Sequence, residues 1–141
     1  MPNIYIKYTI SNQKIIYNPG DIISGTFSLE NRENQDQKLK KVEIKYVEFY
    51  YALQRIIFKH VWNPIMNTLK HRVVDKKRII KAGETLEYAF KFKLPSTWKV
   101  KNSRKIKDWK LILCFFEKTG LVSSTGIDGN GVYEVPAVKK S

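Results

Sequence analysis

The sequence predicts a single all-β domain, an antiparallel β-sandwich of about seven or eight strands. Apolar and polar residues alternate with a period of two in most segments, whereas helical periodicity is almost absent. Turn-forming dipeptides separate these segments at spacings typical of sandwiches. The chain has 141 residues, of which 43% are hydrophobic. This length and composition suffice for one domain, residues 1–141, with a buried core.

The first two strands are expected at residues 4–10 and 22–29. Both alternate between apolar and polar positions, and the turn Asn18-Pro19-Gly20-Asp21 separates them. Proline presets its own φ angle in such a turn, and Gly20 is free to take a positive φ. Gly25 lies within the second strand, where a missing side chain suits a bend or the close approach of another backbone.

Residues 42–53 form a strand whose apolar positions change parity. One face carries Val42, Ile44 and Tyr46, and the other then carries Val47, Phe49, Tyr51 and Leu53. A β-bulge near residues 46–48 would restore a single inward face. Alternatively, the strand passes from one sheet environment to another.

The remaining strands differ in polarity. Residues 68–80 are typical of a long polar strand at a sheet edge, because Lys and Arg discourage unwanted pairing. Residues 109–116 are apolar on both faces and are expected at the centre of a sheet, whereas Pro136 places residues 132–138 at an edge. Residues 85–94 have one strictly apolar face. Five aromatic side chains are expected to meet in the core: Phe27, Phe49, Tyr88, Phe90 and Phe92.

Two motifs resemble the arrestin family. In the first, Tyr17-Asn18-Pro19-Gly20-Asp21 places an aromatic residue and a Pro-Gly-acidic turn before the alternating strand 22–29. In the second, the glycine turn Ala82-Gly83-Glu84 precedes an aromatic-rich strand that ends in Leu94-Pro95. The resemblance extends over residues 4–116.

This resemblance implies an arrestin-like, immunoglobulin-like antiparallel sandwich and an adaptor or scaffold role. Arrestin-like proteins usually carry two tandem domains; they include α-arrestins, the retromer arrestin-like subunit and bacterial sporulation-control proteins. The present chain holds one such domain, so the interdomain polar core of classical arrestins cannot form within it. No segment matches the phosphate-sensing lysines of receptor-binding arrestins.

The sequence does not predict an enzyme, a metal site or a cofactor. His60 and His71 lie 11 residues apart, without a Cys or a paired acid, and are expected to be ordinary surface or boundary histidines. Cys114 lies in an apolar run and is expected to be a small buried hydrophobe. Residues 126–131 are typical of a glycine-rich hairpin loop. A calcium-binding EF-hand loop would also need a bidentate Glu and flanking helices, and neither is apparent in the sequence.

The net charge of +13 is unevenly distributed. Residues 1–37 sum to −1 and the remaining residues to +14. Such a field attracts nucleic acid, anionic membrane surfaces or acidic protein segments, although a lysine-rich surface also serves solubility. The longest apolar runs, such as residues 111–116, are much shorter than the about 20 residues of a membrane-spanning helix. The N-terminus lacks a signal-peptide pattern, and we therefore expect a cytoplasmic protein.

The strongest candidate binding site is the basic loop that follows Pro95. The residues expected to bind there are Trp98, Lys99, Lys101, Arg104, Lys105 and Lys107. Loops on a rigid sandwich commonly carry binding. We therefore expect a non-catalytic adaptor that binds an acidic or extended segment of a partner protein. The alternative is a basic nucleic-acid-binding protein that uses residues 91–110, with Trp98 as an exposed stacking platform and Trp109 in the core.

Overall fold

The computed structural model describes residues 4–97, 104–119, 122–123 and 131–137. Within these ranges the chain contains strands and turns but no helix, which confirms the all-β prediction. The strands are β1 (Ile4–Ile10), β2 (Ile22–Asn31), β3 (Gln37–Ile56), β4 (Lys59–Ile80), β5 (Thr85–Lys93), β6 (Ile106–Thr119), β7 (Val122–Ser123) and β8 (Val132–Val135).

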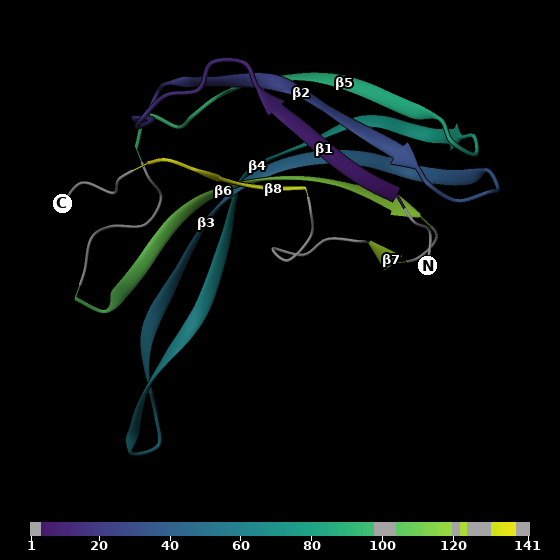
Figure 1. Ribbon diagram of the computed structural model, residues 1–141. Coiled ribbons are helices and arrows are strands. Elements are labelled where there is room, and N and C mark those ends of the chain that lie inside the picture. Colours follow the sequence, from purple (N-terminus) through teal and green to yellow (C-terminus); the bar gives the residue numbers. More distant parts are fainter. Residues whose placement is uncertain (1–3, 98–103, 120–121, 124–130, 138–141) are drawn as a thin grey trace.

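The strands form two antiparallel sheets. One sheet has the order β1-β2-β5, and the other has the order β4-β3-β6-β7 with β8 also paired to β6. Figure 1 shows the two sheets as stacked layers. The predicted antiparallel sandwich is therefore confirmed, and the polar strand predicted at residues 68–80 is part of the edge strand β4.

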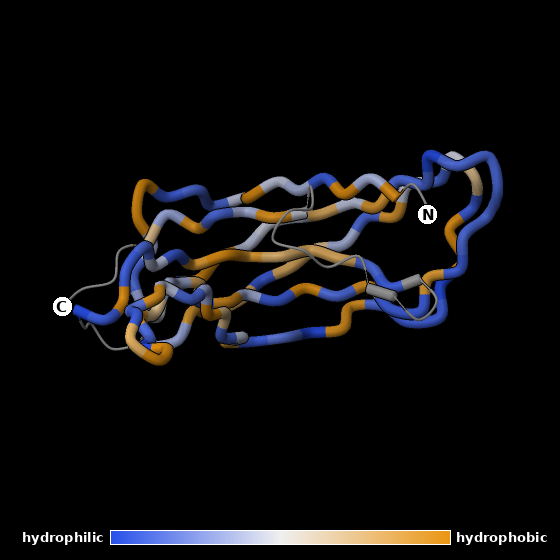
Figure 2. Tube along the Cα trace, turned by 90° about the horizontal axis from the view of Figure 1, so that it is seen from below, coloured by the Kyte–Doolittle hydropathy of each residue, from blue (hydrophilic) through white to orange (hydrophobic). Residues whose placement is uncertain are grey.

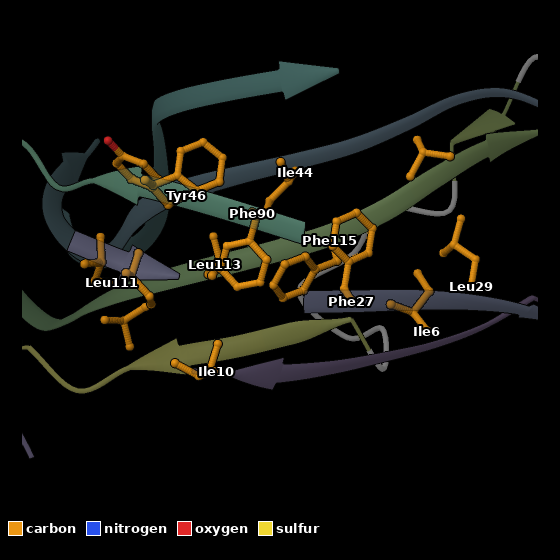
Figure 3. Packing of buried hydrophobic residues seen from close by; sticks show 14 of the residues in the cluster. Ile6, Ile10, Phe27, Leu29, Ile44, Tyr46, Phe90, Leu111, Leu113 and Phe115 are labelled. Atoms are coloured by element: carbon orange, nitrogen blue, oxygen red, sulfur yellow. The ribbon is translucent and has the colours of Figure 1, made fainter. Parts of the chain in front are cut away.

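The space between the sheets is filled by the apolar faces of the strands. Phe27 of β2, Phe90 of β5 and Phe115 of β6 pack together, with ring centroids of Phe27 and Phe90 at 4.8 and 5.1 Å from that of Phe115 (Figure 3). Figure 2 shows hydrophobic and hydrophilic residues alternating along the strands. These rings meet at tilted angles, and large buried aromatic side chains contribute strongly to the stability of such a core.

Two glycines occupy positions that do not suit a side chain, one because of its backbone conformation and the other because of a neighbouring backbone. Gly20 has a φ of 86° in the turn before β2, as predicted. A Cβ atom added to Gly25 would lie 2.0 Å from the carbonyl oxygen of Thr9 on β1. The close backbone approach predicted for Gly25 is therefore confirmed, and Gly25 allows β1 and β2 to pair along their full length.

The apolar residues of β3 lie on the inner face of the sheet up to Tyr46 and on the outer face from Val47. The side chains of β3 alternate without interruption, so the change of parity in the sequence becomes a change of face. A register shift does occur between Tyr46 and Val47, but the extra residue is Leu69 on β4, so β3 itself is not bulged. The residues after the shift consequently point to the outer face of the five-stranded sheet. The expectation that Phe49 joins the core aromatics is wrong. Phe49 packs instead against a second apolar cluster: Val47, Ile112, Cys114 and Phe116.

Strand β6 is buried on both faces, as predicted. Leu111, Leu113 and Phe115 belong to the main core, and the residues between them belong to the outer cluster. The thiol of Cys114 is buried in that cluster, and burial raises its pKa. Trp109 packs at the margin of the main core, where its indole Nε1–H donates a hydrogen bond of 3.1 Å to the carboxylate of Glu48.

Candidate functional site

The outer half of the β3–β4 hairpin leaves the sandwich as a two-stranded arm. Strand β6 pairs with β3 only as far as Ala52, which lies opposite Ile106. Beyond that point β3 and β4 continue to pair, from Leu53 and Trp62 down to the last pair before the turn. We call residues 53–62 the arm. Figure 1 shows it projecting away from both sheets.

The tip of the arm is apolar and exposed. Ile57 and Phe58 form the two-residue turn between β3 and β4, and their exposed fractions are 80% and 90%. Ile56 and Val61 beside them are also exposed. Ile57 has a φ of 56°, a left-handed conformation that is a genuine outlier for a β-branched residue. Strain of this kind persists where the surrounding structure imposes it and is often found at functional sites.

Cations surround the apolar tip. Arg55 and Lys59 are exposed within two residues of the turn, and His60 is exposed next to them. The sequence contains no Asp or Glu between Glu48 and Asp75, so nothing on the arm neutralises this charge. The arm therefore ends in exposed apolar side chains with cations directly behind them. We call Arg55 and Lys59 the collar.

The arm was not predicted, because its turn lacks the usual signals. Two-residue hairpin turns favour Asn-Gly or Gly-containing pairs, whereas this one is Ile57-Phe58. The strand predicted to begin at residue 68 in fact begins at Lys59. Two signals could have identified the arm: three consecutive large apolar residues between cations, and the long stretch without acids.

The described part of the predicted basic loop lies at the base of the arm. Arg104, Lys105 and Lys107 are exposed there. The Lys107 ammonium lies 4.4 Å from the centroid of the Trp62 ring, a cation–π contact between β6 and the arm. Trp98, Lys99 and Lys101 lie outside the described residues.

A second group of cations lies along one open side of the sandwich, between β4 and β5. We call it the basic seam, and it consists of Lys70, Arg72, Lys91 and Lys93. The Arg72 guanidinium lies 4.5 Å and the Lys70 ammonium 5.9 Å from the centroid of the Phe92 ring. All four side chains are exposed, and none of them has an ion-pair partner among the described residues. The two pairs of cations are far apart in the sequence, so their proximity could not be predicted from it.

Hydrogen bonds fix the two strands on either side of the seam. The Tyr46 hydroxyl, on β3, donates a 3.0 Å hydrogen bond to the carbonyl oxygen of Lys93. Burial raises the pKa of Tyr46, so this hydroxyl remains a hydrogen-bond donor to higher pH than an exposed tyrosine would. Farther along, the Tyr88 hydroxyl donates to Asp75 on β4 at 2.8 Å. The seam is thus held between two linked strands and does not consist of loosely placed surface lysines.

The two histidines lie in different environments. His60 is exposed in the arm. The His71 ring lies 2.9 Å from a carboxylate oxygen of Glu43, measured from Nε2, and it stacks on Phe116 at 6.3 Å between ring centroids. The structure does not bring His60 and His71 together: in the register of β3 with β4 they lie opposite Arg55 and Lys45, ten residues apart along β3.

The fold defines the class of protein as an arrestin-like β-sandwich. The chain is similar in structure to Spo0M, the sporulation control protein of Bacillus subtilis, with a TM-score of 0.68 and 14% sequence identity. The match covers 98% of this chain and 50% of Spo0M, so the chain spans half the length of that protein. This likeness confirms the arrestin-like fold expected from the sequence motifs.

Two other solved structures are less similar. They are the alkylpurine DNA glycosylase AlkC of Pseudomonas fluorescens bound to DNA (TM-score 0.45, 15% identity, 96% of this chain and 31% of that chain) and a β-glucosidase of Listeria innocua (TM-score 0.44, 12% identity, 96% and 16%). We infer nothing about this chain from them. No protein-family model and no curated protein matches the sequence. Within the described ranges there is no helix with the length and hydropathy of a membrane span.

Proposed function

We propose that the chain is a non-catalytic adaptor that binds an acidic, extended segment of a partner protein along β5, at the basic seam. The observation that carries the proposal is the meeting of an edge strand with four cations that have no acidic partner in the described part of the chain. The cytoplasmic location expected from the sequence is part of the same proposal.

Strand β5 from Thr85 to Phe92 is a suitable template for an added strand, and beyond it the Lys93 carbonyl accepts the hydrogen bond from Tyr46. It is the last strand of the three-stranded sheet, and its register with β2 is continuous from Thr85 to Lys93. An extended peptide that pairs with such an edge gains main-chain hydrogen bonds, and its alternate side chains face opposite sides of the sheet. Strand β4 is less suitable, because the extra residues Leu69 and Val74 interrupt its register.

The distribution of the cations favours an acidic partner. Lys91 and Lys93 are two residues apart and share the outer face of the sheet, opposite the buried Phe92. Lys70 and Arg72 lie on the other side, over the Phe92 ring. Both faces of an added strand would therefore meet positive charge. A segment with carboxylates on both faces fits this arrangement, and the cations would also accelerate its approach.

A labelled peptide of Glu-Glu-Thr-Thr repeats, which places carboxylates on both faces of an extended strand, tests the proposal by fluorescence polarisation. We expect binding that weakens with salt and that falls in the pairs Lys91→Gln/Lys93→Gln and Lys70→Gln/Arg72→Gln. The matched control, Lys7→Gln/Lys40→Gln, removes the same charge from exposed positions outside the seam and should bind like the original protein. Equal weakening in the control would show adsorption by net charge and would overturn the proposal.

The same peptide with alternate backbone amides methylated separates strand addition from simple charge attraction. N-methylation removes the donors that an added strand needs, so binding should be lost although the charge is unchanged. The nucleic-acid alternative is tested with a single-stranded oligonucleotide of mixed sequence. Tighter binding of this oligonucleotide, with a steep salt slope and sensitivity to the seam substitutions, would favour that alternative.

A further inference from the structure

The tip of the arm has no role in the proposed binding along β5. Exposed apolar side chains in a contiguous group usually mark an interaction site. At this tip the group is held on a projecting two-stranded ribbon, with Ile57 in a strained conformation. The feature therefore calls for a separate explanation, which does not depend on the seam.

We infer that the tip inserts into the surface of a lipid bilayer that carries anionic phospholipid. Ile56, Ile57 and Phe58 would enter the boundary between headgroups and acyl chains, and Arg55 and Lys59 would contact lipid phosphates. Three observations support a bilayer: the distance of each residue from the tip of the arm, the charge of the collar and the projection of the tip at the end of a two-stranded ribbon.

The distance of each residue from the tip follows from the register of the hairpin. Ile57 and Phe58 are at the end, Ile56 pairs with Lys59 one step behind, and Arg55 pairs with His60 two steps behind. Each step along a strand is about 3.3 Å, so the cations lie roughly 3–7 Å behind the apolar end. Side chains that bind at a membrane surface bury their apolar part about 5–10 Å into the headgroup boundary. The cations would then reach the phosphates with their apolar stems beside the acyl chains.

The charge of the collar selects an anionic surface. No acid occurs on the arm or on the adjoining parts of β3 and β4 as far as Glu48 and Asp75. Lys107, which contacts Trp62 at the base of the arm, adds another cation on the same side. Basic residues next to an anionic leaflet each add about fivefold to binding. Membrane-surface aromatic residues commonly accompany such cations, and Trp62 lies four steps behind the tip.

The projecting position of the tip favours a bilayer over a protein pocket as the occupant. Pairing between β3 and β4 continues to the last residue before the turn, so Ile57 and Phe58 project at the end of a ribbon with solvent around them. A fluid bilayer receives such a point without a complementary cavity. A protein partner would need a pocket matched to two large side chains, and the collar of cations would have to face acids around that pocket.

Vesicle flotation tests the inference. We expect the protein to float with vesicles of phosphatidylcholine and phosphatidylglycerol and to stay in solution with phosphatidylcholine alone. The variant Ile57→Ser/Phe58→Ser should lose about tenfold or more of this binding, because it removes the inserted apolar surface but no charge. The variant Arg55→Gln/Lys59→Gln should lose roughly fivefold for each cation.

The control variant is Ile15→Ser/Ile79→Ser. Both residues are large, apolar and exposed, and neither belongs to the arm. It should bind vesicles like the original protein. All of these positions are on the surface, so the thermal unfolding of each variant should remain close to that of the original protein, which separates loss of binding from loss of fold.

A tryptophan at the tip gives a direct measure of insertion. In Phe58→Trp, the emission of the new indole should shift to shorter wavelength on addition of anionic vesicles, and lipids brominated on the upper acyl chain should quench it. Binding of Ile57→Ser/Phe58→Ser equal to that of the original protein, or an unshifted emission in bound Phe58→Trp, would overturn the inference. Concentration-dependent dimers that the Ser variant abolishes, in the absence of vesicle binding, would assign the tip to a second copy of the chain instead.

Discussion

The Tyr88 hydroxyl of β5 donates a 2.8 Å hydrogen bond to the Asp75 carboxylate of β4, and this bond connects the two sheets on the side of the basic seam. Asp75 also accepts a hydrogen bond of 2.9 Å from the backbone N–H of Lys76, and Arg78 lies 4.0 Å away. Burial, followed by the bond to Asp75, raises the pKa of Tyr88 far above its ordinary value of 10.0. The proton therefore stays on Tyr88 in the folded protein at pH values where an unfolded chain would release it.

Stability at high pH should depend on Tyr88. A raised pKa in the folded state contributes stability below the unfolded pKa, and this contribution is lost as pH rises above about 10. The variant Tyr88→Phe should lose about 1 kcal/mol of unfolding free energy at neutral pH, the value of one hydrogen bond. It should also show a shallower fall in stability above pH 10, measured by urea unfolding. A fall as steep as in the original protein would show that other tyrosines determine the alkaline limit.

Replacing Gly25 should destabilise the sandwich strongly. A methyl group at this position would collide with the backbone of β1, because the carbonyl oxygen of Thr9 is only 2.0 Å from the site of the Cβ. Backbone cannot rotate away as a side chain can, so we expect Gly25→Ala to cost about 2–3 kcal/mol. Thermal unfolding measures the loss. An unchanged melting temperature would mean that β1 moves aside at little cost.

Replacing Gly20 should also destabilise, but for a conformational reason. No atom lies within 4 Å of a Cβ added there, and the residue has a φ of 86°. Only the left-handed backbone opposes a side chain, and for Gly20→Val we expect a loss of about 1–2 kcal/mol. Gly20→Asn should be milder because Asn tolerates this region. Equal stability of the Val variant and the original protein would contradict the turn as described.

The same substitution at two phenylalanines should give opposite results. Phe90 is buried among the core rings, and Phe90→Ala should lower the unfolding free energy by about 3–5 kcal/mol. Phe58 is 90% exposed at the tip of the arm, and Phe58→Ala should change stability by less than about 0.5 kcal/mol. Chemical denaturation of both variants tests this. A large loss at Phe58 would show that the tip folds back against the protein.

Relief of the strained turn should raise stability and reduce the vesicle binding inferred for the tip. Ile57→Gly replaces a β-branched residue at a φ of 56° with the residue that adopts this region freely. The unfolding free energy should rise by about 1 kcal/mol. Strain of this kind costs about 1–3 kcal/mol, and glycine offsets part of the gain because it increases the conformational entropy of the unfolded chain. Vesicle flotation of the same variant should decrease. A destabilised Ile57→Gly would show that the side chain contributes packing in the free protein.

The sequence predicted the strands whose signal is local. Residues 85–94 alternate without interruption and form β5 as expected, and the apolar run at 109–116 forms the buried centre of β6. The face of Phe49 could not be predicted, because it depends on which of two paired strands holds the extra residue. The extra residue lies on β4, and the sequence around Phe49 does not determine how β4 pairs with β3.

The candidate sites were predicted only in part for a similar reason. The basic loop after Pro95 was identified from charge density, and three of its residues lie at the base of the arm. The basic seam requires β4 and β5 to lie side by side across two sheets, which no short sequence window reveals. The arm was missed because its turn residues, Ile57 and Phe58, are strand formers that contradict the usual turn chemistry.

The long β3–β4 hairpin also has a consequence for how the chain folds. Its pairs near the turn join neighbours in sequence, whereas β2 must find β5 and β3 must find β6 across much longer loops. Local contacts form first because closing a short loop costs less entropy. Hairpin zippering would start at Ile57, the residue whose backbone resists the turn. The left-handed backbone at Ile57 would therefore oppose the earliest event in the assembly of the sandwich.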